Sequence, residues 1–200
     1  MNVEEAKNIL LNAAQYFKAQ SEGYKTWGNV NVLQIAFRIS NAEFLIIDEN
    51  KSLEEITVDD IHLQSSSSNI FGQIFSSRKK INTILITQQE YASQLQEEVP
   101  AILDDQAQLL GVSIRLAKNE TQIAKALSGR YAAILPDKKS ICIGTSLDDA
   151  YVAAQLLEKT SKVFIEATHI GGAKAINKIE AWLMQQYYQF KYSKEAVKNR

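Results

Sequence analysis

The stretch Ile81-Asn-Thr-Ile-Leu-Ile-Thr87 has the length and the β-branched content of a strand that is buried on both faces of a sheet. Just before it, Ile70, Phe71, Ile74 and Phe75 follow the spacing of one helical face. A helix therefore leads directly into a central strand. This succession is typical of the α/β class of fold.

The segments before this helix continue the same pattern. Apolar residues at helical spacing predict an amphipathic helix over Val3–Phe17. Val30–Ile39 and Phe44–Ile47 are rich in β-branched and aromatic residues and flank the turn-forming pair Asn41-Ala42, so they predict an antiparallel strand pair. We interpret Ser52–Asp60 as short helical turns.

A run of four serines, Ser65 to Ser68, stands immediately before the helix that leads into the central strand. Serine hydroxyls at a helix start accept hydrogen bonds from backbone amides that lack a partner. The run is therefore predicted to cap that helix.

Alternating elements also fill the rest of the chain. Helices are predicted over 101–110, 120–127 (capped by Asn119), 147–170 and 176–190, and strands over 112–117, 130–135 and 141–143. The last helix would place Ile176, Ile179, Leu183, Tyr187 and Phe190 on one face. We expect one domain over residues 1–200, with 191–200 as a frayed tail.

Composition excludes several classes of partner. The chain has 22 basic and 23 acidic residues and a formal net charge of −1, so it lacks the positive field of proteins that bind nucleic acid or acidic membranes. The only cysteine, Cys142, rules out an intramolecular disulfide and is expected in the core. The start of the chain is acidic and no apolar run approaches the roughly 20 residues of a membrane span. We therefore expect a soluble cytoplasmic protein.

Seven segments, taken in order, resemble successive landmarks of the class II aldolase/adducin family. They are Thr26-Trp-Gly-Asn-Val-Asn-Val32, Leu45-Ile-Ile47, Leu53–Ile61, Ser65-Ser66, Ile81–Leu85, Tyr91-Ala92 and Ile143-Gly-Thr-Ser-Leu-Asp-Asp-Ala-Tyr151. The resemblance implies a three-layer α/β/α domain around a central, largely antiparallel sheet. It also implies assembly as a homo-oligomer, a tetramer or a dimer.

In the aldolases and epimerases of this family, three histidines hold a zinc-type ion that polarises a ketose carbonyl, and a glutamate moves the proton. The resemblance places Ile86, Gln88 and Lys138 at the three ligand positions, and Ser67 at the position of the glutamate. A protonated lysine has no lone pair for a metal. With only two histidines, His62 and His169, one chain cannot supply three such ligands. We therefore expect no zinc or other cofactor and no catalytic residue.

The resemblance also implies a phosphate cradle, of which parts persist. The remnant pocket is predicted to contain Gly28, Asn29, Ser65, Ser66, Ser67 and Lys138, and could take a small anionic or sugar ligand. The middle pair of the cradle corresponds to Glu49-Asn50, whose carboxylate would repel a phosphate. Simpler roles stay open, because Gly-Asn permits a tight turn and serines cap helices.

Three functions follow as hypotheses. The first is a pseudoenzyme, in which the fold persists as a binding, regulatory or assembly module. The second is a sugar-phosphate aldolase or epimerase, a lyase of the fuculose or rhamnulose 1-phosphate type, with an atypical site. The third is a structural subunit that pairs with a catalytic paralogue. Whether the chain is an enzyme is left open, and the missing ligands favour a non-catalytic role.

Overall fold

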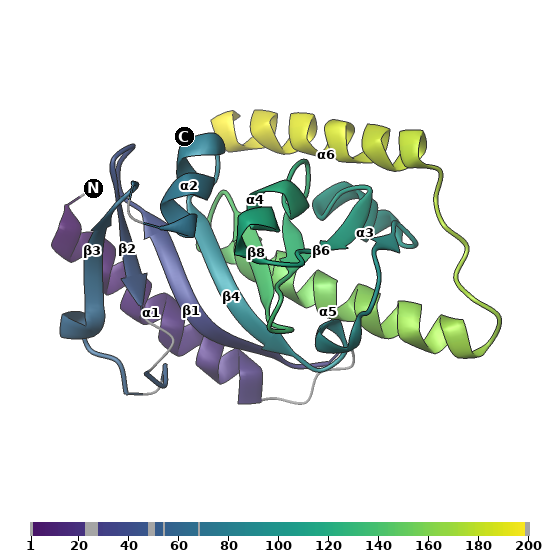
Figure 1. Ribbon diagram of the computed structural model, residues 1–200. Coiled ribbons are helices and arrows are strands. Elements are labelled where there is room, and N and C mark those ends of the chain that lie inside the picture. The colour runs from purple at the N-terminus through teal and green to yellow at the C-terminus, as the bar shows by residue number, and fades with distance from the viewer. Residues whose placement is uncertain (1, 23–27, 48–50, 54, 68, 199–200) are drawn as a thin grey trace.

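The computed structural model describes residues 2–22, 28–47, 51–53, 55–67 and 69–198, with side chains for 2–20 and from 28 to 191 within those ranges. Eight strands form one sheet in the order β3-β2-β1-β4-β8-β7-β6-β5 (Figure 1). The strands are β1 (Val30–Arg38), β2 (Glu43–Ile47), β3 (Ile61–Ser65), β4 (Thr83–Gln89), β5 (Val99–Pro100), β6 (Ser113–Leu116), β7 (Ala132–Ile134) and β8 (Ser140–Gly144). All pairings among the described strands are antiparallel except β6–β7. The predicted α/β class with a largely antiparallel sheet is confirmed.

Two long helices, α1 (Val3–Glu22) and α5 (Leu147–His169), cover one face of the sheet (Figure 1). The apolar stripe of α1 is buried there, including Leu10 and Phe17. Helix α5 begins where the sequence predicts, because the Ser146 side chain accepts a hydrogen bond from the Asp149 amide over 3.0 Å.

Shorter helices, α2 (Ile70–Ser77) and α4 (Ile123–Ala126), cover the opposite face. Successive residues of the central strands point alternately to the two layers, so Leu85 and Cys142 pack toward α1 and α5, whereas Ile84 and Ile143 pack toward α2 and α4. This explains the continuous apolar run of β4. Cys142 is fully buried, as predicted, and its burial raises the pKa of the thiol to about 12.

Helix α6 (Lys178–Lys198) packs on α3 (Asp104–Leu109) and runs along the top of the molecule in the view of Figure 1. Ile179, Leu183, Tyr187 and Phe190 share one face of this helix, as predicted, but that face is exposed: their exposed fractions lie between 55% and 70%. Ala181 and Gln185 face the core instead. Periodicity identified the stripe, but the small Ala181 permits closer packing against Ala101 and Ala107 of the α3 region. The helix continues to Lys198, beyond Phe190, where its apolar pattern ends.

Three other expectations are corrected. The serine run does not cap α2: the Asn69 side chain accepts from the Gly72 amide over 3.2 Å, and Ser65 ends strand β3, which the sequence did not predict. The helix predicted over 101–110 begins only at Asp104, since Pro100 ends the short strand β5. The helix predicted over 120–127 is a 3₁₀ turn, Glu120–Gln122, followed by α4, and the Asn119 side chain bonds Thr121 rather than a backbone amide.

Two further 3₁₀ turns, Val58–Asp60 and Ala92–Gln94, precede β3 and follow β4. The short turn expected within Ser52–Asp60 is thus present at its end. Among the described residues, no helix combines the length and the apolar character that a membrane crossing requires.

Candidate functional site

The Gly28-Asn29 turn lies beside the carboxyl end of β4. It leads into β1, whose first residue Val30 pairs with Gln89, while Asn31 pairs with Gln88. Gly28 has φ +103°, a backbone conformation that residues with a side chain rarely adopt, so glycine is needed at this position. The exposed Asn29 therefore stands at the end of the sheet where the family's metal positions are expected.

A buried carboxyl group supports this turn. Glu158 of α5 is fully buried and accepts hydrogen bonds from the amides of Tyr91 and Ala92, each over 2.9 Å. A methyl group added to Gly28 would lie 2.6 Å from its Oε1. Burial raises the pKa of Glu158, and the backbone amides partly oppose this shift. Glu158 thus joins the turn, the loop after β4 and helix α5.

The last residues of β4 add a buried polar chain. The Thr87 hydroxyl donates to Gln89 Oε1 over 3.0 Å, and Gln89 Nε2 donates to the Ala154 carbonyl over 2.6 Å. Neither Gln89 nor Glu158 belongs to a motif that is recognisable in the sequence. The sequence offered one indication for each residue. Gln89 is a polar residue at the end of an apolar strand, and Glu158 is an acidic residue next to the apolar stripe of a helix.

The three positions that the resemblance assigns to metal ligands, Ile86, Gln88 and Lys138, lie near one another at one end of the sheet. Ile86 pairs with Ile141 and Thr87 with Ser140, so the end of β4 runs beside the hairpin that carries Lys138. Lys138 has φ 69°, and its ammonium group donates to the Leu95 carbonyl over 3.3 Å. The fold therefore brings these positions together.

The side chains at these positions do not suit zinc. Ile86 is 6% exposed and offers only hydrocarbon, Gln88 offers a neutral amide, and the Lys138 ammonium group is a donor only. His62 lies on edge strand β3, and His169 ends α5 with its Nδ1 2.8 Å from the Ile165 carbonyl. In the described parts of the chain, no cluster of three His, Cys, Asp or Glu residues could hold a metal.

The serines of the predicted pocket lie elsewhere. Ser65 pairs with Glu43, the Ser66 amide donates to the Ala42 carbonyl over 2.8 Å, and the Ser65 and Ser67 hydroxyls are 3.1 Å apart. They sit beside the β1–β2 hairpin, whereas Asn29 precedes the opposite end of β1. Eight steps of a strand span roughly 25 Å.

Within one chain, the serines are thus separated from Gly28, Asn29 and Lys138. Glu49 and Asn50, the middle pair of the implied cradle, lie outside the described residues, as do Thr26, Trp27 and Ser68. The structure brings together only the part of the predicted pocket that lies at the Gly28 end of the sheet.

The sequence matches the family model described as "Class II Aldolase and Adducin N-terminal domain" over residues 10–165. The chain belongs to the class II aldolase and adducin family. The match includes the Gly28 turn, the serines, β4 and Lys138. It stops within α5, before α6.

Solved structures share the fold of this family member. An L-fuculose 1-phosphate aldolase matches with a TM-score of 0.78 and 19% identity, over 92% of this chain and 96% of its own. The L-fuculose 1-phosphate aldolase from Glaciozyma antarctica PI12 matches with 0.70 and 20%, over 92% and 81%. YgbL from Escherichia coli, a putative aldolase/epimerase/decarboxylase, matches with 0.68 and 10%, over 92% and 99%. No curated protein matched the sequence.

Proposed function

We propose that this chain is a class II aldolase/adducin-like protein without the family's zinc chemistry, which serves as a non-catalytic binding, regulatory or assembly module. The observation that carries the proposal is that the side chains at the three assigned ligand positions cannot bind zinc as histidines do. Ile86 is buried among hydrocarbon, and Lys138 donates to a carbonyl. An ammonium ion there would repel a divalent cation.

The position of the family's proton-transferring glutamate supports the same proposal. Ser67 stands there, with its hydroxyl 3.1 Å from that of Ser65. A serine hydroxyl without a neighbouring base cannot take the proton that a carboxylate would. A remnant pocket at Gly28, Asn29 and Lys138 could still hold a small anionic or sugar ligand.

We also infer that the chain forms a homo-oligomer and acts in the cytoplasm. The exposed apolar stripe of α6, made of Ile179, Leu183, Tyr187 and Phe190, supports the first point. Two copies of one self-complementary stripe can cover each other around a twofold axis. The only cysteine is buried and unpaired, which suits a reducing compartment.

The alternative is a sugar-phosphate aldolase or epimerase of the fuculose or rhamnulose 1-phosphate type with an atypical site. The similarity of its fold to that of L-fuculose 1-phosphate aldolases favours this candidate. It would need a metal-binding site that the mapped positions do not offer.

The experiment that separates the two is elemental analysis of the purified protein after incubation with zinc and desalting, followed by aldol-cleavage assays on ketose 1-phosphates. We expect substoichiometric zinc and no cleavage. The double variant His62→Asn/His169→Asn is the control, because zinc that disappears with these exposed imidazoles is adventitious. One tightly bound ion per chain together with turnover would reject the non-catalytic proposal in favour of the aldolase.

A further inference from the structure

A cavity of about 570 Å³ lies between the loop after α2, the turn before β7 and one flank of α6. Four of its lining residues, Arg78, Lys79, Lys80 and Arg130, are basic, and none is acidic. The whole chain carries a net charge of −1, so positive charge is concentrated here. The cavity contains none of the residues that the resemblance assigns to the family's site.

Arg78 is held in place by several contacts. Its Nη1 donates to the carbonyls of Leu127 and Arg130, over 2.9 and 2.5 Å, and its guanidinium lies 4.8 Å from the centre of the Tyr131 ring. Desolvation lowers its pKa. No carboxylate among the described residues forms an ion pair with it. An anion in the cavity would supply the missing compensation for a partly buried charge.

No side-chain hydrogen bond or ion pair within the described part of the chain accounts for the position of Lys79 and Lys80. Cations after a helix often serve to bond its last carbonyls, but Arg38 does this for α2: its Nη2 donates to the carbonyls of Phe75 and Arg78, over 2.6 and 3.2 Å. Both lysines are exposed, and neither has a partner among the described side chains. Their ammonium groups are therefore available to a ligand.

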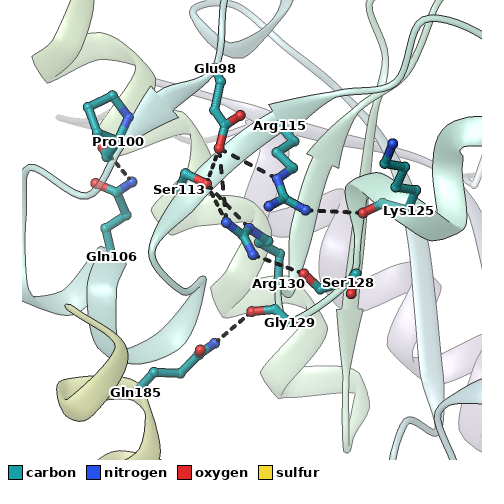
Figure 2. A network of polar contacts seen from close by, with 10 residues as sticks. All are labelled: Glu98, Pro100, Gln106, Ser113, Arg115, Lys125, Ser128, Gly129, Arg130 and Gln185. Atoms are coloured by element: carbon teal, nitrogen blue, oxygen red, sulfur yellow. Dashed lines mark hydrogen bonds and ion pairs between the residues drawn. The ribbon is translucent and has the colours of Figure 1, made fainter. Parts of the chain in front are cut away.

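A polar network fixes the opposite wall (Figure 2). Arg130 donates to the Ser113 hydroxyl over 2.8 Å and to the Ser128 carbonyl over 3.0 Å, and lies 3.9 Å from Glu98. The Gln185 side chain donates to the Gly129 carbonyl over 3.2 Å. These bonds tie helix α6 to the turn before β7, so the wall is ordered without a ligand.

The α6 flank supplies a planar apolar surface and amide groups. Trp182 is 52% exposed and lines the cavity beside Gln185, Gln186 and Gln189. An exposed indole is a stacking surface for an aromatic ring, and amide groups can pair with the polar edge of such a ring. Trp182, Gln185 and Gln189 lie to one side of the stripe of α6 that begins at Ile179, and Gln186 borders that stripe.

We propose that the cavity binds a small phosphorylated ligand with a planar ring, of the chemical class of a nucleoside monophosphate. Arg78, Lys79 and Lys80 hold the phosphate, because the charge of a guanidinium whose Nη1 is fixed by two carbonyls and the donors of two ammonium groups match its charge and its acceptors. The ring stacks on Trp182. Pockets of roughly 300–1,000 Å³ are usual for ligands of this size. The site is independent of the Gly28 end of the sheet and of the proposed loss of zinc chemistry.

The test is isothermal titration of the full chain with AMP, GMP, CMP and UMP, and with ribose 5-phosphate. At least one nucleotide is expected to bind with one-to-one stoichiometry and more tightly than ribose 5-phosphate. The double variant Lys79→Gln/Lys80→Gln changes two exposed residues. It should lower the affinity for this nucleotide about tenfold, which corresponds to roughly 1.4 kcal/mol of binding free energy. Trp182→Leu should lower the affinity for the nucleotide but leave the affinity for ribose 5-phosphate unchanged.

The matched control is Lys118→Gln/Lys174→Gln, which removes the same charge from two exposed lysines outside the cavity and should leave the affinity unchanged. The proposal is overturned if none of the four nucleotides binds at about millimolar concentration, or if both double variants behave alike. Equal affinity for ribose 5-phosphate and the nucleotide would overturn the role of the ring and of Trp182.

Discussion

At the scale of single residues, the contact of Gly28 with Glu158 governs the candidate site. Gly28 combines a positive φ with a close approach to a buried carboxyl group. Each feature alone would favour glycine, and together they leave no room for another side chain. Sequence alone indicated a Gly-Asn turn, but gave no sign of the carboxyl group behind it.

Gly28→Ala should lower the free energy of unfolding by about 2 to 4 kcal/mol, from backbone strain and from the overlap with Glu158. Gly171→Ala is the control, because Gly171 has a similar φ of +114° and no atom within 4 Å of an added methyl group. It should cost only about 1 kcal/mol. Chemical denaturation of both variants measures the difference, and equal losses would show that the overlap relaxes at no cost.

The buried Glu158 predicts a pH dependence. Because burial raises its pKa in the folded state, the folded chain holds this proton more tightly than the unfolded chain does. Its contribution to stability is therefore greatest below the unfolded pKa, about 4.3, and is lost as the pH rises through the higher folded pKa.

Glu158→Gln should remove this pH dependence of the free energy of unfolding. The stability of the variant relative to the wild type should therefore improve as the pH rises from about 4 toward neutrality. At acidic pH the variant should be less stable by about 1 to 3 kcal/mol, since one oxygen replaces two acceptors. Denaturation at several pH values measures this. Glu120→Gln, at an exposed position, controls for the loss of one acidic residue. If the difference in the free energy of unfolding between Glu158→Gln and the wild type stayed constant with pH, the raised pKa of Glu158 would be contradicted.

At the scale of elements, α2 shows why capping is hard to place from sequence. Four serines and Asn69 precede this helix, and each residue type is a good cap. The pairing of β3 with β2 holds Ser65 in the sheet, and Ser66 packs against Gly72, so the chain reaches helical geometry only after Asn69.

Asn69→Ala should therefore destabilise the protein by about 0.5 to 2 kcal/mol, because the Gly72 amide loses its acceptor. Ser67→Ala, in the same segment, should stay within about 0.5 kcal/mol of the wild type. Thermal unfolding of the two variants distinguishes the caps. A larger loss for Ser67→Ala would restore the serine run as the cap.

At the scale of the whole molecule, the exposed stripe of α6 carries the inferred oligomer. Leu183→Lys/Tyr187→Lys changes two residues that are 55% and 70% exposed, so the fold of one chain should survive. Light scattering after size-exclusion chromatography should show an oligomer for the wild type and a mass near 22.4 kDa for the variant. Ile170→Lys, another exposed apolar residue, should leave the mass of the wild type unchanged. An unchanged mass for the double variant would place the interface elsewhere.

The sequence by itself determined the order of most elements, the family and the number of histidines that could serve as metal ligands. These properties are local or countable. The run Ile81–Thr87 predicts a strand by itself, although β4 lies two residues further on, at Thr83–Gln89, and two histidines stay two in any fold. It failed for β3, whose exposed His62 and Leu63 lack a strand-like apolar pattern because β3 is an edge strand.

Only the tertiary structure decided which residues meet. Strand register places Asn29 and Ser65 at opposite ends of β1, although the family pattern groups them. Packing on α3 turns the apolar stripe of α6 outward, and the same packing sets Trp182 near Arg78 and Lys79, about a hundred residues away in sequence. Periodicity shows which side chains share a face, but what covers that face depends on contacts between distant segments.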